Sequence, residues 1–184
     1  MKGDANKTQL ILDMYLYDPI FSQPHDSASV LDVALPIAEI ATMRSGFDQD
    51  DMWLGFHCDN PLGDGGGHDH MDCGVFVLDS QGVNWFEDLG KDDYNISNYA
   101  HCYRKRGEGH NVVIFNPTSD YSFKKGGSAN LEKTEFAECG GYAIGNLDNA
   151  YRDDIGVISY KRGAKLDDLR RVATIQDEIR LSAP

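Results

Sequence analysis

The sequence predicts an all-β protein, an antiparallel sandwich or barrel preceded by a short helical or linker segment. From Val33 onward, apolar segments of strand length alternate with turn residues, and almost no apolar pattern repeats at the helical period. The chain has 184 residues, of which 41% are hydrophobic and 10% aromatic, enough for one domain with a sizeable core. We therefore divide the chain into residues 1–32, a linker-like segment, and residues 33–184, an antiparallel β domain.

The first segment differs in pattern from the rest. Residues 10–17 are mostly apolar and end at Asp18-Pro19, which predicts a short helix or a buried segment, and a linker-like stretch with Pro24 follows. Each expected strand beyond it is an apolar run bounded by turn residues such as Gly46, Gly82, Gly126-Gly127, Gly140-Gly141 and Arg162-Gly163. These strands cover residues 37–43, 53–58, 73–78, 83–87, 112–115, 129–138, 142–147, 157–161 and 171–179.

Charge and cysteine content narrow the classes of function. The net charge of -13 argues against a nucleic-acid binder with a broad basic face. No apolar run approaches the length of a membrane span, and the N-terminus lacks the apolar core of a signal peptide. We therefore expect either a cytosolic chain or a piece of a protein whose targeting segment lies elsewhere. The four cysteines form no CxxC pair, which favours free, mostly buried thiols over a zinc–thiolate site or a disulfide framework.

Two histidines and a carboxylate stand close together in residues 68–72. An extended strand would place His68, His70 and Asp72 on one face, because successive side chains of a strand alternate in direction. Glycines precede this stretch and an apolar run at residues 75–78 follows it, which indicates a loop that enters a buried strand. Imidazoles and a carboxylate at this spacing are suited to a metal site, a proton-transfer site, or both.

Two residues further along the chain complete a candidate ligand set. Asp88 lies in an apolar segment, where an unpaired charge is costly, and His110 lies at the start of another apolar segment. Together with His70 they form a two-imidazole, one-carboxylate set that suits Zn²⁺ with a fourth position for water. The alternative is that His110 bonds to a backbone carbonyl and that Asp88 pairs with Arg104 or Arg106.

Three ordered segments carry a family resemblance. They are Gly67-His68-Asp69-His70-Met71-Asp72-Cys73-Gly74, Trp85-Phe86-Glu87-Asp88-Leu89-Gly90 and Tyr103-Arg104-Lys105-Arg106-Gly107-Glu108-Gly109-His110-Asn111. In this order they resemble motifs of the heparinase II/III family of polysaccharide lyases, and of the alginate lyases that share its architecture. The similarity runs from about Ala41 to Ile179. Where the family usually has Leu-Asp-Ala-Gly, this chain has Met71-Asp72-Cys73-Gly74, which preserves the carboxylate.

The resemblance implies a fold, a metal and a ligand set. Members join an N-terminal helical toroid to a C-terminal antiparallel β-sandwich, and the three motifs belong to the sandwich. By position, the zinc ligands of the family correspond to His70, Asp88 and His110. The family's zinc supports the loop that carries the first histidine rather than activating a water. The resemblance further suggests a periplasmic or secreted protein.

The resemblance also implies residues that face the substrate. His68 corresponds to the histidine at the cleft between toroid and sandwich, where it assists binding or catalysis. Tyr99, Tyr103 and Arg104 are candidates for a further residue that reaches this cleft. The principal acid and base of the family come from the toroid, which residues 1–32 are too short to form. These residues are then a linker or a remnant of a helical domain.

The hypothesis that follows is a zinc-binding β-sandwich domain of a lyase that cleaves uronic-acid-containing glycans by β-elimination. The substrate would be an acidic polysaccharide, heparin- or heparan sulfate-like or alginate-like, and the chain would be inactive without its missing helical partner domain. One alternative is a non-catalytic carbohydrate-binding or scaffolding domain with a structural zinc. Another is a small metallohydrolase with Asp72 or Glu108 as its general base.

Overall fold

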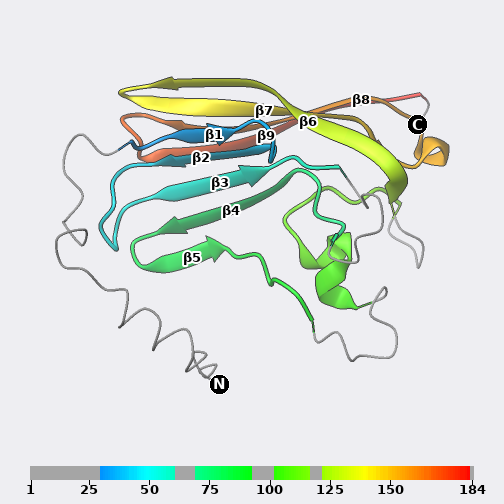
Figure 1. The fold of residues 1–184 in the computed structure, drawn as a ribbon, viewed down its shortest axis with the longest axis horizontal. Helices are drawn as coiled ribbons and strands as arrows, with labels where there is room; N and C mark the ends of the chain where they lie inside the picture. Colours follow the sequence, from blue (N-terminus) through cyan, green and yellow to red (C-terminus); the bar gives the residue numbers. More distant parts are fainter. Residues whose placement is uncertain (1–29, 61–68, 93–101, 117–121, 183–184) are drawn as a thin grey trace. The chain divides into compact units, whose positions relative to one another are not determined.

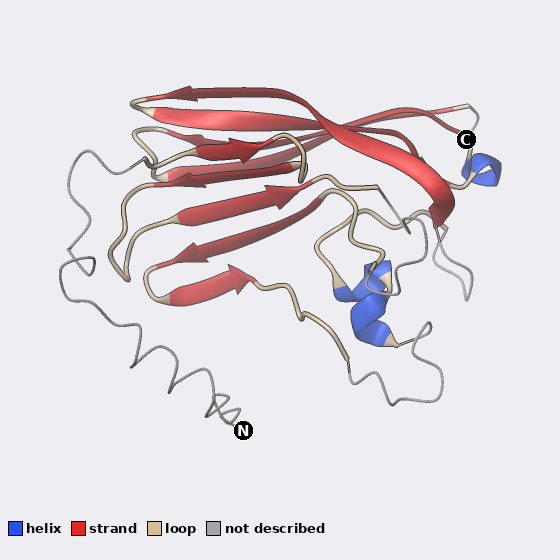
Figure 2. Cartoon of the chain, viewed as in Figure 1, coloured by secondary structure: helices blue, strands red, loops and turns tan. Residues whose placement is uncertain are grey.

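The chain folds into two antiparallel β-sheets, which confirms the predicted all-β class (Figure 1). A computed structural model describes residues 30–60, 69–92, 102–116 and 122–182. All of these except Val30 belong to one unit, Leu31–Pro184. The expected helix or linker at residues 1–32 therefore lies almost entirely outside the described residues. Helical segments in the described part are short 3-10 turns in the connections between strands (Figure 2).

Each sheet follows the order of the sequence, and every strand runs antiparallel to its neighbour. The first sheet contains β1 (Val33–Leu35), β2 (Ile40–Arg44), β3 (Trp53–His57), β4 (Val75–Ser80) and β5 (Val83–Phe86). The second contains β6 (Phe123–Ala137), β7 (Gly140–Tyr151), β8 (Val157–Asp167) and β9 (Val172–Leu181). Among the described residues, no helix is long and apolar enough to cross a membrane.

The core lies between the two sheets, where β2 contacts β7 and β3 contacts β8. Its fully buried side chains come from alternating positions, as expected for strands with one inward face: Ala41, Met43, Leu54 and Phe56 in the first sheet, and Ala143, Leu147, Tyr160, Ala164 and Leu166 in the second. At Gly145, a Cβ atom would lie 2.5 Å from Sγ of Cys58 and 3.0 Å from the Phe56 ring. The sheets approach too closely there for any side chain.

The four cysteines are free thiols, as the sequence predicts. Cys58 and Cys73 are buried in the core, whereas Cys139 is exposed.

The prediction of a strand at residues 112–115 is wrong. Side chains, rather than a neighbouring strand, bind the carbonyl groups of this segment. The Tyr151 hydroxyl donates to the carbonyl of Val113 at 2.9 Å, and the Ser122 hydroxyl donates to that of Phe115 at 2.8 Å. Val112, Val113 and Phe115 pack against the core. The apolar run therefore reflected burial and not pairing.

Two expected turns lie inside strands instead. Gly126 has a φ of +69° within β6, where the pairing register with β7 shifts between Phe123 and Ser128. This glycine therefore allows a β-bulge within the strand and does not reverse the chain. Gly163 lies in the middle of β8, opposite Ile144 of β7 and Gln176 of β9.

Candidate metal centre

His70 and Asp72 lie in a loop that leads into β4, as the glycines before this stretch and the apolar run after it predict. The N–H of Val75 donates to the carbonyl of Asp72 at 2.8 Å, and Gly74 adopts a φ of +79°, which closes a turn. Successive side chains of this loop still alternate in direction, as they would in a strand. Met71 and Cys73 are only 3% and 2% exposed in the core, while His70 and Asp72 are partly exposed and belong to a cluster that could hold a metal ion.

His110 follows a second tight loop. This loop contains the 3-10 turns η2 (Tyr103–Lys105) and η3 (Gly107–Gly109), and the N–H of Met71 donates to the carbonyl of Lys105 at 2.9 Å. A Cβ atom at Gly109 would lie 2.4 Å from the Tyr103 carbonyl oxygen, so the two turns pack directly on each other. This packing brings His110 beside the loop of His70.

The His110 side chain is fully buried, and its two ring nitrogens differ in environment. Nδ1 lies 2.6 Å from Oδ2 of Asp88, and the other oxygen of that carboxylate accepts the N–H of Gly90 at 2.8 Å. Nε2 is buried and makes no hydrogen bond of acceptable geometry within the described part of the chain, although the backbone of Arg104 lies near enough to the imidazole to help raise its pKa. A buried, unpaired ring nitrogen is costly unless a further group binds it.

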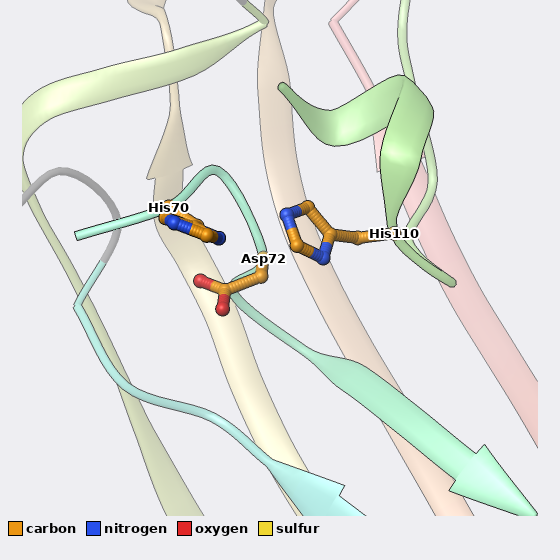
Figure 3. A group of neighbouring side chains, drawn as sticks. All are labelled: His70, Asp72 and His110. Carbon is orange, nitrogen blue, oxygen red and sulfur yellow. The ribbon is translucent and has the colours of Figure 1, made fainter. Parts of the chain in front are cut away.

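Among the described residues, His70, Asp72 and His110 form a cluster that could hold a metal ion (Figure 3). One ligand atom from each lies within 4.8 Å of the other two, and the imidazole centroids of His70 and His110 are 5.3 Å apart. Ligand atoms around a zinc ion at bond lengths of about 2.1 Å are roughly 3.4 Å apart. Small side-chain rotations therefore suffice for these three residues to hold one ion, which would also satisfy the unpaired Nε2.

The electrostatics differ between the two histidines: they favour the neutral imidazole at His70 and the protonated one at His110. Burial lowers the pKa of His70 despite the nearby charge of Asp72, which favours the neutral imidazole that binds metals. Burial also opposes the charged form of His110, but the hydrogen bond and charge of Asp88 outweigh it and raise the pKa. At Asp88, burial is outweighed by the hydrogen bonds from His110 and Gly90, which lower the pKa. Asp88 therefore remains a carboxylate that orients the imidazole of His110.

Arg162 of β8 ties both loops of the site to the second sheet. Its side chain is 4% exposed, and Nη1 donates to the carbonyls of Gly74 at 2.8 Å and Asn111 at 2.9 Å. Nε and Nη2 bind both carboxylate oxygens of Asp177 on β9, at 2.7 and 2.9 Å. Asp177 also accepts the Tyr160 hydroxyl at 2.8 Å. Sequence analysis did not identify Arg162, although a charged residue between inward-facing Tyr160 and Ala164 was the available signal.

Two of the four residues predicted to face the substrate, Tyr103 and Arg104, lie in the described part of the chain. Tyr103 is 60% exposed on η2. Nη1 of Arg104 donates to the Leu89 carbonyl at 2.9 Å, and Nε lies 3.8 Å from Asp92. His68 and Tyr99 lie outside the described residues.

The alternative pairing of Asp88 with an arginine does not occur. Arg104 lies beside Asp92, Arg106 binds the carboxylate of Glu108 at 2.8 Å, and Asp88 binds His110. The structure places Asp88 at Nδ1 of His110 and places His70 and Asp72 near His110. The predicted ligand set of His70, Asp88 and His110 stays a prediction.

Comparison with protein families gives a match over residues 32–184, to the model described as heparinase II/III-like, C-terminal. The search of curated proteins gives no match.

Three solved structures illustrate the shared fold. The heparan sulfate lyase HepC from Pedobacter heparinus matches with a TM-score of 0.68 at 17% identity, over 89% of this chain and 24% of that chain. A structure titled heparinase III matches with a TM-score of 0.63 at 19% identity, over 79% and 22%. A heparinase III described as the BT4657 gene product, with methylated lysines, matches with a TM-score of 0.71 at 13% identity, over 96% and 28%. This chain thus spans about a quarter of their length.

Proposed function

This chain belongs to the heparinase II/III-like family, through the C-terminal domain that its residues 32–184 match, and we propose that it serves as the β-sandwich domain of a polysaccharide lyase. The proposed substrates are glycans that contain uronic acid, either heparin- or heparan sulfate-like or alginate-like. The similar solved structures are titled as a heparan sulfate lyase and as heparinase III. Because the chain spans 24% of the first of these, we assign the activity to the sandwich together with a helical domain.

The buried, unpaired Nε2 of His110 is the observation that carries the proposal, because a zinc ion at this position would satisfy it. His70 and Asp72 offer the next two ligand atoms. Two imidazoles and a carboxylate suit zinc better than calcium or magnesium, which prefer oxygen ligands alone. When bound, the ion would hold the two loops together, and elimination requires no metal-bound hydroxide.

Two roles are proposed for Asp88: it either orients His110 through Nδ1 or binds the metal ion directly. In the observed geometry Asp88 binds Nδ1 and leaves Nε2 for the ion, an arrangement in which a carboxylate orients a metal-binding histidine. The family resemblance instead implies Asp88 as a direct ligand together with His70 and His110. We favour the first role, because Asp72 lies within reach of the two imidazoles.

The proposed reaction is a β-elimination. A base removes the proton at C5 of the uronate, which is acidic because it lies α to the carboxyl group. The electron pair left at C5 forms the C4–C5 double bond while the C4–O bond to the next sugar breaks, and an acid protonates the leaving oxygen. The negative charge that develops on the carboxyl group needs donors such as arginine, histidine or asparagine.

The sandwich would contribute residues at the rim of the cleft. Tyr103 and Arg104 lie on η2, whose Lys105 carbonyl accepts the N–H of Met71 beside His70. His68 and Tyr99 complete the set of candidates from the sequence. We assign the principal acid and base to the helical domain, and also the basic groove, because a chain with a net charge of -13 repels a polyanion.

A domain-exchange experiment tests this proposal. Residues 32–184 would replace the C-terminal domain of a heparinase III, and release of unsaturated uronide products would be followed by their ultraviolet absorbance. We expect turnover from the hybrid and little from the isolated chain. His68→Ala should lower turnover of the hybrid while leaving its zinc content unchanged. A folded, zinc-loaded hybrid without turnover would instead favour a scaffolding domain, and robust turnover by the isolated chain would refute the division of labour.

A further inference from the structure

The second sheet has a groove that is separate from the metal centre. Its volume is about 330 Å³, and its lining comes from β6, β7, β8 and β9, with no residue from the loops at 69–74 and 102–116. The lining residues used below are Glu132, Tyr142, Ile144, Lys161, Gly163, Lys165, Thr174, Gln176 and Glu178.

The groove follows from the pairing register of three strands. Ile144, Gly163 and Gln176 form one row across β7, β8 and β9, and Tyr142, Lys165 and Thr174 form a neighbouring row. A Cβ atom at Gly163 would meet only the Gln176 carbonyl oxygen, at 3.9 Å. The missing side chain in the middle of β8 therefore leaves the hollow. Ala143 and Ala164, which are fully buried, close it from the core side.

Tyr142 is held in place at one side of the groove. Its hydroxyl donates to Oε2 of Glu135 at 2.8 Å, and Nζ of Lys133 lies 5.1 Å from its ring centroid. An aromatic ring that is already fixed loses little conformational freedom when a ligand packs against it. The ring and the Ile144 side chain thus offer a preformed apolar surface.

The charges of the groove are balanced, although the chain is strongly acidic. Its lining contains two lysines and two glutamates. Lys161 forms an ion pair with Glu132, and Lys165 with Asp167 at 2.5 Å. Nε2 of Gln176 donates to Glu178 at 2.7 Å. A sulfated polyanion finds no uncompensated cation here, whereas an uncharged ligand with several hydroxyl groups finds both donors and acceptors.

We propose that this groove binds an uncharged pyranose unit of an oligosaccharide. The apolar face of the sugar ring would pack on Tyr142 and Ile144. Its hydroxyl groups would bond to Thr174, Gln176 and the lysine–glutamate pairs. The volume lies within the usual range of about 300 to 1,000 Å³ for small-molecule sites. The site requires neither the metal nor a helical domain, so it stands or falls independently of the lyase proposal.

Calorimetric titration of the full chain with cellotetraose, mannotetraose and chitotetraose tests the proposal, with a heparin tetrasaccharide for comparison. We expect at least one neutral tetrasaccharide to bind more tightly than the heparin fragment. Gly163→Val should weaken that binding at least tenfold because its side chain fills the hollow. It should preserve the melting temperature, since a β-branched residue suits a strand. Tyr142→Ala should weaken binding similarly.

Ser159→Val is the matched control, because it adds a β-branched side chain in the same strand outside the groove lining and should bind normally. The proposal is overturned if no neutral tetrasaccharide binds at millimolar concentration, if the heparin fragment binds best, or if Gly163→Val binds as the wild type does.

Discussion

In the proposed metal centre His110 determines the geometry, because its two nitrogens would give the carboxylates of Asp88 and Asp72 different roles. Asp88→Asn should weaken zinc affinity about 10- to 100-fold, the usual effect of removing a partner that orients a ligand. Asp72→Asn should weaken it further, since it removes a direct ligand. Competition with a chromophoric chelator measures both affinities. The reverse order would identify Asp88 as the ligand and contradict the favoured arrangement.

Arg162 should control metal affinity from outside the centre. Lysine keeps the charge but cannot bind the Gly74 and Asn111 carbonyls together with both oxygens of Asp177. Arg162→Lys should therefore destabilise the protein by about 2 kcal/mol and lower zinc affinity at least tenfold. Chemical denaturation and chelator competition measure the two effects.

Arg170→Lys is the matched control for Arg162→Lys. Arg170 is also buried and forms a bidentate pair, with Asp32, and it donates to the carbonyl of Arg44. None of these partners belongs to the loops of the metal centre. Its variant should lose stability and keep its zinc affinity. Equal zinc affinities in the two variants would show that Arg162 does not position the site.

Asp177 should make stability depend on acidity. Burial opposes its ionised form, but the hydrogen bonds and charge of Arg162 outweigh burial and lower its pKa. A carboxyl group with a lowered pKa in the folded state contributes stability above its unfolded pKa of about 3.9, and this stability disappears as the pH falls through the folded pKa.

Asp177→Asn should therefore remove part of the acid dependence of unfolding and cost about 3 kcal/mol at neutral pH, because it leaves Arg162 buried without its counter-charge. Urea denaturation between neutral pH and about pH 3 measures this. Asp154→Asn, which breaks an exposed pair with Arg152, should change little. An unchanged slope of stability against pH in Asp177→Asn would contradict the assignment.

Among the elements of secondary structure, the turn before β4 depends on Gly74. Gly74 has a φ of +79°, and a Cβ atom there would lie 2.7 Å from Cδ2 of the fully buried Leu147. Gly74→Ala should therefore cost about 2 to 3 kcal/mol through backbone strain and displacement of Leu147, and it should also weaken zinc binding through Asp72. Gly126→Ala is the control. Gly126 has a φ of +69°, but a Cβ atom there would meet nothing within 4 Å, so this substitution measures the cost of backbone strain alone. Melting temperatures that fall equally in Gly74→Ala and Gly126→Ala would exclude a packing role.

Strands were predictable where an apolar run ended at a turn on both sides. The expected strand at 53–58 corresponds to β3 (Trp53–His57), and the one at 83–87 to β5 (Val83–Phe86). Prediction from the sequence failed for a segment that packs against the core without pairing in a sheet, and for a glycine that lies inside a strand. Residues 112–115 are partly buried and have no partner strand, and side chains bind the carbonyls of Val113 and Phe115. Gly163 reads as a turn signal but lies within β8, where its missing side chain forms a groove.

Across the whole molecule, the site was predictable in its histidines and less so in its carboxylates. The motifs place His70, Asp88 and His110 in one set. In the structure Asp88 binds His110, whereas the cluster that could hold a metal ion consists of His70, Asp72 and His110. Which carboxylate approaches which nitrogen depends on the path of two loops, and no spacing rule encodes that. Arg162 escaped notice because it lies in β8, 88 residues from Gly74 and 51 from Asn111 along the chain, and only the packing of the sheets brings it to them.

The central claim is that this β-sandwich holds a zinc ion between its two site loops, and metal analysis of the purified chain tests it most directly. After equilibration with zinc and removal of the excess, mass spectrometry should find roughly one zinc ion per wild-type chain. His70→Ala and His110→Ala should each carry almost none, and the chelated wild type should melt at a lower temperature than the loaded protein. Full zinc occupancy in both variants, or no stoichiometric zinc in the wild type, would contradict the account.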